Sequence, residues 1–201
     1  QKQMKTIEWD AEAAEKAGFE HFMMKEIHEQ PKAVQDTLNS VIKDGKIDLS
    51  SVEITEDEIK SFEQIYIVAC GSAWHVGMAA QYVLEDMADI PVRVELASEF
   101  RYRKVTINQK ALVIVISQSG ETIDTLAALK EAKRLGAQSI AVTNSIGSSI
   151  ARETDVAIYT LAGPEIAVAS TKAYTTQLVS LLMLALYMGQ VKESISLELV
   201  K

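Results

Sequence analysis

The pattern of apolar residues predicts five strands along this chain. Residues 111–116 form an unbroken apolar run in which four of six residues are β-branched, and such runs are typical of strands buried on both faces. This run changes abruptly into a hydroxyl-rich turn at residues 117–122, and helix-forming residues follow. The remaining predicted strands each contain β-branched residues and lie at residues 65–70, 92–96, 139–143 and 156–159.

Helical segments separate these strands. Residues 71–88 carry a clear inward apolar stripe, a helical turn is expected at 97–102, and a helix that ends at Leu135 follows the hydroxyl-rich turn. A short helix at 148–152 and a long one at 170–188 complete the pattern. Strands that alternate with helices predict an α/β three-layer sandwich, with helices on both faces of a five-stranded parallel sheet. We expect the strand order 2-1-3-4-5, the commonest for five such strands.

This topology predicts where a ligand would bind. In the order 2-1-3-4-5 the connections leave strands 1 and 3 in opposite directions, which opens a crevice at the carboxyl ends of these strands. Two loops flank that crevice, the first at residues 71–73 and the second at residues 117–122. Both are rich in small residues that can form hydrogen bonds.

Residues 1–62 are expected to form a separate segment, and residues 63–201 the main domain. Residues 1–18 resemble an acidic linker, and a helical pattern begins at Phe19. Pro31 interrupts this pattern, which predicts a kinked helix or two helices that meet there. Gly45 ends the helical segment, and residues 48–62 are expected to form a loop and a short helix.

Charge and composition exclude several functions. The net charge is −8, and residues 1–63 carry fifteen acidic against eight basic residues, which leaves thirteen against twelve for the rest. There is no basic face for nucleic acid, and no apolar segment is long enough to span a membrane. Cys70 is the single cysteine, so we expect no disulfide and a cytoplasmic protein. The chain opens at Gln1 rather than methionine, which suggests a piece of something longer.

The second loop carries the chemistry of an anion site. Ser117, Ser119 and Thr122 offer hydroxyls, Gln118 an amide, and Gly120 an unobstructed backbone N–H, all without positive charge. Together with the first N–H groups of the following helix, they fit a phosphate. The alternative is that Ser119 only caps the helix while Gly120 turns the chain. Four side-chain donors in six residues exceed what a cap needs, which favours anion binding.

The segment before the last helix is less decisive. Ser170 or Thr171 should cap that helix, so Lys172 would lie in its first turn, where a cation opposes the helix dipole. Lys172 either pairs with a carboxylate such as Glu165 or belongs to a wall that closes over an anionic ligand. The helix is apolar nearly all round, which suggests burial between the sheet and another domain or a second subunit. After Gly189 a further helix is expected to begin.

Other candidates for chemistry are weak. Cys70 is expected to be an inert thiol in the core. His21 and His28 have no partners at metal-ligand spacing. Neither a dinucleotide fingerprint nor a P-loop occurs, so we expect no metal and no cofactor.

The motifs resemble one family. Residues 117–122, with the preceding strand, resemble the signature of SIS (sugar isomerase) domains. Segments 25–31, 69–73, 97–103 and 165–172 follow in the same order in the glucosamine-6-phosphate synthases. The resemblance covers residue 19 to the end and implies the first of two SIS domains in the isomerase half. That family makes glucosamine 6-phosphate from fructose 6-phosphate and ammonia from a glutaminase domain.

The resemblance also implies roles for residues. The loop residues Ser117, Gln118, Ser119, Gly120 and Thr122 would hold the phosphate of fructose 6-phosphate or glucose 6-phosphate. The sugar would contact Ser72, Val168 and Ser170. Ala73 and Ala167 replace a hydroxyl residue and a glycine that are usual in the family, so the contact at Ala73 is in doubt.

No catalytic residue is implied for this chain, because the isomerase base, the ring-opening histidine and the Schiff-base lysine belong to the second SIS domain or the neighbouring subunit. We therefore expect sugar-phosphate binding without turnover, a second SIS domain and a glutaminase domain as partners, and a homodimer. The rival interpretations are a non-catalytic sugar-phosphate sensor, a stand-alone SIS isomerase and a structural assembly module.

Overall fold

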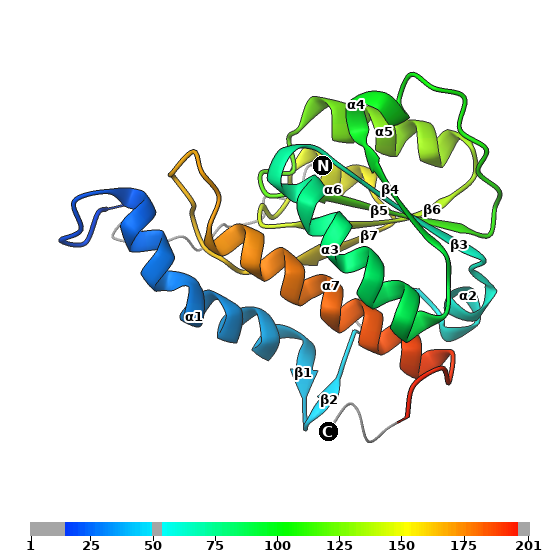
Figure 1. Ribbon diagram of the computed structural model, residues 1–201, viewed down its shortest axis with the longest axis horizontal. Coiled ribbons are helices and arrows are strands. Elements are labelled where there is room, and N and C mark those ends of the chain that lie inside the picture. Colours follow the sequence, from blue (N-terminus) through cyan, green and yellow to red (C-terminus); the bar gives the residue numbers. More distant parts are fainter. Residues whose placement is uncertain (1–14, 50–53, 197–201) are drawn as a thin grey trace, which may run out of the picture.

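A computed structural model describes residues 15–49 and 54–196, and it has a five-stranded parallel sheet at its centre (Figure 1). The sheet has the order β4-β3-β5-β6-β7, which confirms the predicted order 2-1-3-4-5. The strands of this sheet are β3 (Gln64–Ala69), β4 (Val92–Leu96), β5 (Ala111–Ser117), β6 (Gln138–Thr143) and β7 (Val156–Tyr159). The helices are α1 (Phe22–Val41), α2 (Glu56–Ser61), α3 (Gly71–Ala88), α4 (Ala97–Phe100), α5 (Ile123–Arg134), α6 (Ser149–Glu153) and α7 (Lys172–Val191).

Two hydrophobic cores lie on the two faces of the sheet, as expected for three layers. Every residue of β5 is buried, and its side chains alternate between the cores. Leu112, Ile114 and Ile116 join the core beneath α3 and α7, whereas Val113 and Val115 join the core beneath α4, α5 and α6. A strand buried on both faces needs apolar residues at every position, which explains the unbroken run in the sequence.

The ends of β3 and β5 lie side by side in the parallel register. Ala69 pairs with Ile116 and β5 extends one residue further to Ser117, which pairs with Thr143 of β6. The polypeptide therefore leaves β3 and β5 at the same edge of the sheet. The loop after β3 leads into α3 on one face, and the loop after β5 leads into α5 on the other (Figure 1).

Helix α1 runs through Pro31 as one element, so of the two expected alternatives, a kinked helix or two helices, the second was wrong. Proline lacks the N–H that would bond to the carbonyl of Ile27. The side-chain amide of Gln30 donates to that carbonyl instead, at 3.2 Å. A neighbouring side chain thus replaces the missing hydrogen bond, which satisfies the free backbone group.

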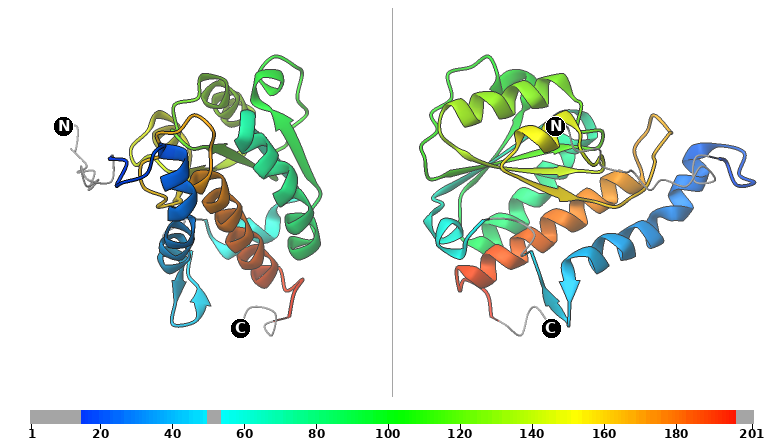
Figure 2. Two further views of the ribbon diagram at one scale, coloured as in Figure 1. Left: turned by 60° about the vertical axis from the view of Figure 1, so that its left-hand side comes forward. Right: turned by 180° about the vertical axis from the view of Figure 1, so that it is seen from behind.

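The surroundings of α7 correct a second expectation. One side of α7 packs on α3 and another on α1, and the two long helices α1 and α7 lie side by side in both views of Figure 2. An element of the same chain therefore covers the helix where the sequence suggested another domain or a second subunit. The helix also continues through Gly189 to Val191, so the expected new helix after Gly189 is not formed within the described residues.

The N-terminal segment contains a hairpin that the sequence analysis missed. Strands β1 (Ile42–Lys43) and β2 (Lys46–Ile47) are antiparallel and joined by Asp44 and Gly45. Both turn residues have positive φ, 50° and 71°, as a type I′ turn requires. Asp-Gly is the usual sequence for that turn, so the signal was available. The following α2 begins with a capping box between Thr55 and Glu58, and its first turn is acidic.

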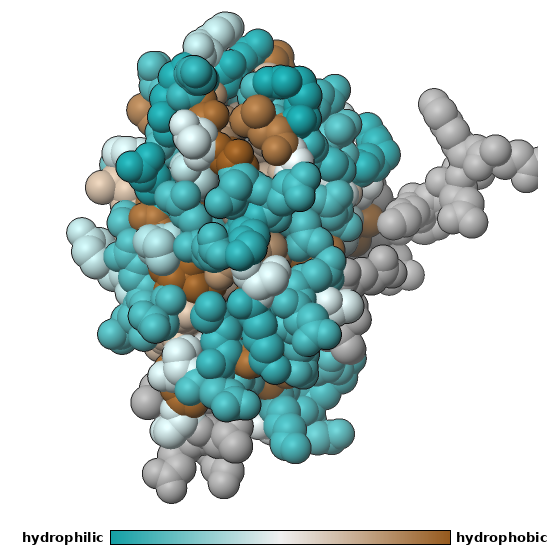
Figure 3. All heavy atoms as spheres, turned by 90° about the vertical axis from the view of Figure 1, so that its right-hand side faces the viewer, coloured by the Kyte–Doolittle hydropathy of each residue, from teal (hydrophilic) through white to brown (hydrophobic). Residues whose placement is uncertain are grey.

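The face of the molecule shown in Figure 3 is largely hydrophilic, with hydrophobic residues in small separate patches. Within the described residues, no helix is both long enough and apolar enough to cross a membrane.

Candidate functional site

A cavity of about 290 Å³ opens at the edge of the sheet where β3 and β5 end. Its wall is formed by the start of α3, the loop after β5, the segment before α7, and α7 itself. Seven of the eight predicted binding residues line it: Ser72, Ser117, Gln118, Ser119, Thr122, Val168 and Ser170. The structure therefore brings together residues that lie almost a hundred positions apart in the sequence.

Two helices point their N-termini into this region without side-chain caps. Neither Cys70 at the start of α3 nor Thr122 at the start of α5 makes a side-chain capping bond. The first N–H groups of a helix have no acceptor within the helix, and the helix dipole adds partial positive charge there. Two such ends beside one cavity favour an anionic group.

Internal hydrogen bonds shape the loop from Ser117 to Thr122, called here the phosphate loop. The hydroxyls of Ser117 and Thr122 lie 2.9 Å apart, and the Gly120 N–H donates to Ser117 Oγ at 3.1 Å. The expectation of a free N–H at Gly120 is therefore wrong, and Gly120 is absent from the cavity wall. Ser119 Oγ accepts from the Glu121 N–H at 3.2 Å and does not cap α5, which excludes the capping alternative.

Gly120 has a packing role in the phosphate loop. Its φ is +64°, and a Cβ atom at this position would lie 2.0 Å from Ser148 Oγ. Only glycine fits there, because any side chain would both strain the backbone and collide with the start of α6. Close packing against α6 thus fixes the shape of the loop, although Gly120 does not line the cavity.

A carboxylate from the segment before α7 caps that helix. This segment, residues 160–171, is called the strap, and it stands beside the N-terminal end of α1 (Figure 1). Glu165 accepts from the N–H groups of Thr171 and Ala173 at 2.9 and 3.1 Å, and from the Ser170 hydroxyl at 2.9 Å. The predicted cap by Ser170 or Thr171 is therefore corrected, because Thr171 makes no side-chain cap.

Lys172 is paired inside the protein and does not line the cavity. Its side chain is only 4% exposed, and Nζ lies 2.6 Å from Glu29 Oε2 on α1. The prediction of a carboxylate partner is confirmed, but the partner is Glu29 and not Glu165. No lysine, arginine or histidine of the described part of the chain lines the cavity, so its donors are neutral.

Helix α1 also holds the strap through Glu26, which the sequence analysis did not identify. Glu26 is 2% exposed, and its Oε1 accepts from the N–H groups of Ile166 and Ala167 at 2.6 and 3.1 Å. The Thr37 hydroxyl donates to the carbonyl of Thr160 at the other end of the strap. The only sequence signal for these contacts was the family resemblance of segment 25–31.

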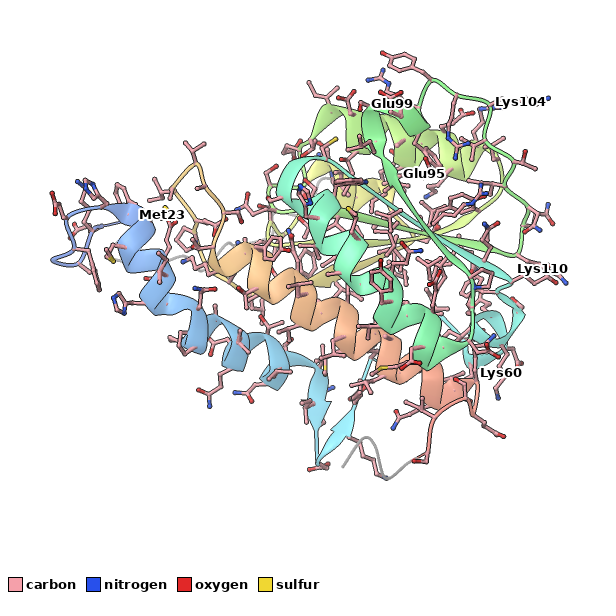
Figure 4. The ribbon with its side chains drawn as sticks, viewed as in Figure 1. Met23, Lys60, Glu95, Glu99, Lys104 and Lys110 are labelled. Carbon is pink, nitrogen blue, oxygen red and sulfur yellow. The ribbon has the colours of Figure 1, made fainter. Side chains whose placement is uncertain are left out.

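The remaining candidates have clear positions. Cys70 packs against the core beneath α4, α5 and α6, as expected, but it is only half-buried and also lines the cavity. The Val168 side chain lines the cavity mouth and is fully exposed. His21 and His28 belong to no metal-binding cluster among the described residues. In Figure 4, Met23 marks the end of α1 beside the strap, while Lys60, Glu95, Glu99, Lys104 and Lys110 lie on the opposite side of the molecule.

Glu121 links the phosphate loop to α6. Its Oε1 accepts from the Ser149 N–H at 2.7 Å, and hydrogen bonds from Ser149 hold the pKa of the Glu121 carboxyl below its ordinary value. The Glu121 carboxylate thus caps a neighbouring helix. Glu121 does not line the cavity, so its charge is directed away from the cavity wall.

A larger cavity, of about 750 Å³, lies elsewhere, between the β1–β2 hairpin, α2 and the end of α7. Charges of both signs line it, and burial raises the pKa of Tyr187 beside it, with smaller contributions from Glu56 and Asp48. No strand of the five-stranded sheet ends in its described wall, and the start of α2, which lines it through Glu56, has a capping box, so its chemistry is less defined than that of the smaller cavity.

Comparison with known proteins places this geometry in a family. The sequence profile of the SIS domain matches residues 58–187. The chain belongs to the SIS domain family. Because this match covers β3 to α7, it includes both loops that form the cavity and the strap between β7 and α7.

The relatives of this SIS domain are larger proteins. The chain is 57% identical over 199 residues to glutamine–fructose-6-phosphate aminotransferase (isomerizing) of Clostridium acetobutylicum, covering 98% of this chain and 33% of the relative. It is 60% identical over 181 residues to the protein of that name from Caldanaerobacter subterraneus subsp. tengcongensis, covering 90% and 30%. The chain thus spans about a third of the length of these curated relatives.

A solved structure shows the same arrangement. The C-terminal domain of glucosamine-fructose-6-phosphate aminotransferase from Francisella tularensis superposes with a TM-score of 0.88 at 43% identity. The match covers 92% of this SIS domain chain and 52% of that chain. About half of the relative's domain therefore has no counterpart here.

Proposed function

We propose that this SIS domain is the sugar-phosphate-binding part of an enzyme that makes glucosamine 6-phosphate from fructose 6-phosphate and glutamine-derived ammonia. The observation that carries this proposal is the cavity with neutral donors at two uncapped helix starts. A phosphate dianion suits such a site, because backbone N–H groups, hydroxyls and helix dipoles bind it without a cation. The names of the relatives supply the substrate, fructose 6-phosphate.

The ligand would lie with its phosphate in the phosphate loop, bound by Ser117, Gln118, Ser119 and Thr122. Its sugar would extend toward Ser72 at the start of α3 and toward Val168 and Ser170 of the strap. Fructose 6-phosphate and glucose 6-phosphate share this phosphate, and either fits the proposal. Ala73, where the family usually has a hydroxyl, lines the same wall and removes one possible contact.

Binding without turnover is the expected behaviour of the isolated chain. No histidine or lysine of the described residues lines the cavity, and the carboxylate of Glu165 is occupied by the start of α7. Isomerisation needs a group that moves protons between carbon atoms. We infer that a second SIS domain or a neighbouring subunit supplies it, that a glutaminase domain supplies ammonia, and that the protein works as a cytoplasmic homodimer.

A sugar-phosphate sensor is the main alternative. Such a protein would need a DNA-binding element such as a helix-turn-helix, in addition to the ligand site. The described N-terminal segment has one long helix followed by a two-residue hairpin, and it is acidic. The sensor therefore has less support than the enzyme.

Ligand-dependent melting tests the proposal. A ligand at about a hundred times its Kd stabilises a protein by roughly 2.7 kcal/mol. We expect fructose 6-phosphate to raise the melting temperature, inorganic phosphate to do so at higher concentration, and fructose to have no effect. Ser119→Ala should abolish most of the shift, whereas the control Ser61→Ala, on exposed α2, should keep it.

Two results would contradict the proposal. An unchanged shift with Ser119→Ala would show that the phosphate loop does not bind the phosphate. Production of glucose 6-phosphate from fructose 6-phosphate by the purified chain would show that the chain carries its own isomerase base.

A further inference from the structure

Gln177 is an unusual buried residue of α7. It is 3% exposed, and it lines the cavity. Its side-chain amide has no hydrogen-bond partner in the described residues, and its nitrogen and oxygen are not among the fully buried polar atoms that lack a partner. The amide therefore keeps a small exposed area in a residue that lines the cavity.

The buried polar neighbours of Gln177 on the same helix are satisfied. The Thr176 hydroxyl donates to the carbonyls of Lys172 and Ala173, and the Ser180 hydroxyl donates to the carbonyl of Thr176. Buried polar groups are almost always hydrogen-bonded, and an exception needs an explanation. For Gln177 the explanation is that its partner is whatever occupies the cavity.

The position of Gln177 complements that of the phosphate loop. The loop leads into α5, which covers one face of the sheet, whereas α7 covers the other face with α3. The cavity crosses the sheet edge between them, above Ile116 of β5. A ligand whose phosphate lies at the start of α5 would therefore extend across the ends of β3 and β5 toward α7.

We propose that Gln177 is a substrate-binding residue that selects the sugar, through a hydrogen bond between its amide and a sugar hydroxyl at the end of the cavity opposite the phosphate loop. The inference rests on the proposed function. A neutral amide both donates and accepts, as a hydroxyl does, so the pair can form in either direction. A site built to bond a hydroxyl rejects ligands without one, because the amide then stays unpaired.

The test is Gln177→Leu, which keeps the size of the side chain and removes its hydrogen-bonding groups. We expect the affinity for fructose 6-phosphate, measured by calorimetry, to fall about tenfold, the effect of one lost hydrogen bond. The affinity for inorganic phosphate should not change, because phosphate has no sugar hydroxyl. Ser119→Ala should weaken both ligands.

Stability of the unliganded protein gives a second readout. An unpaired amide in a buried position destabilises the fold, so Gln177→Leu should keep or raise the melting temperature while it lowers affinity. Gln177→Met, unbranched like glutamine, provides a second variant if leucine disturbs packing. Ser180→Ala, three residues along the same helix and outside the cavity wall, is the control and should leave both affinities unchanged.

Three outcomes would overturn the inference. In the first, both variants bind fructose 6-phosphate as tightly as the wild type. In the second, the affinities for phosphate and for the sugar phosphate fall equally and the melting temperature falls too. In the third, the wild-type protein binds phosphate as tightly as the sugar phosphate. A wild-type protein that binds neither ligand would instead refute the proposed function. In that case the melting temperatures of the variants still decide whether the amide is unpaired.

Discussion

Removal of the Glu26 carboxylate should loosen the strap and lower stability, although Glu26 itself does not line the cavity. Glu26 Oε1 is the acceptor for two successive backbone N–H groups, those of Ile166 and Ala167. In Glu26→Ala these groups lose their acceptor. Because Glu26 is 2% exposed, water cannot replace the carboxylate unless the strap moves away from α1.

The contacts set the size of the effect. A hydrogen bond to a charged group contributes about 1.5–3 kcal/mol, and two bonds to one oxygen are not fully additive. We therefore expect Glu26→Ala to cost about 3 kcal/mol, which for a chain of this length lowers the melting temperature by about 6–12 °C. Glu26→Gln should cost only about 1 kcal/mol, because an amide oxygen can accept the same two N–H groups. Its NH₂ would replace Oε2, which has no partner among the described residues.

Urea unfolding and amide hydrogen exchange measure the two parts of this prediction. Exchange at Ile166 and Ala167 should accelerate in Glu26→Ala and stay slow in Glu26→Gln. The control Glu20→Ala removes an exposed carboxylate near the start of the same helix and should change neither quantity. The reasoning is refuted if Glu26→Ala leaves the exchange of both amides unchanged, or if glutamine is as damaging as alanine.

Two further predictions concern contacts at the two opposite ends of the strands. In urea unfolding, Gly120→Ala should destabilise the protein by at least about 2 kcal/mol more than the control Gly147→Ala. Both glycines have positive φ, but only the new Cβ at position 120 would lie 2.0 Å from Ser148 Oγ. Equal losses of stability in the two variants would exclude this clash. Burial raises the pKa of Asp155, but hydrogen bonds from Ser139 and Lys133, with the charge of Lys133, outweigh burial and hold the pKa below its ordinary value. A carboxyl whose pKa is lower in the folded state stabilises the fold at pH values above its unfolded-state pKa. This stabilisation is lost as the pH falls through the folded-state pKa. The stability gap between wild type and Asp155→Asn should therefore be full at pH 7 and shrink below about pH 4, and a constant gap would contradict this.

The sheet, its order and the cavity loops could be predicted because their signals are local. A doubly buried strand needs apolar residues at consecutive positions, and the run at 111–116 supplies them. The switch point of the topology then follows from the order of the strands. Seven of eight predicted binding residues line the cavity for this reason. Whether they bind a sugar phosphate stays a prediction, as does the division of the chain at residue 62.

The errors concern contacts between distant segments. Nothing near Lys172 in the sequence indicates that its partner is Glu29, 143 residues away. The same holds for Glu26, whose partners lie on the strap, and for α1 as the cover of α7. At Pro31 the error had a different cause, because the rule that proline breaks a helix ignores a neighbour such as Gln30 that can satisfy the free carbonyl.

The cavity wall has neutral donors and one carboxylate, that of Glu165, and the pairing of charges around α7 explains how such a wall could still favour an anion. Glu165 takes up the free N–H groups of α7, and Glu29 neutralises Lys172 in the first turn of the same helix. The starts of α3 and α5 are left uncapped, so their partial positive charge is directed at the cavity without competition. A lysine in the wall would bind any anion strongly, whereas aligned N–H groups and hydroxyls bind one of matching shape. If the proposed function holds, the capped helix α7 would contribute the neutral Gln177, and the two uncapped helices would contribute the partial positive charge that favours the phosphate.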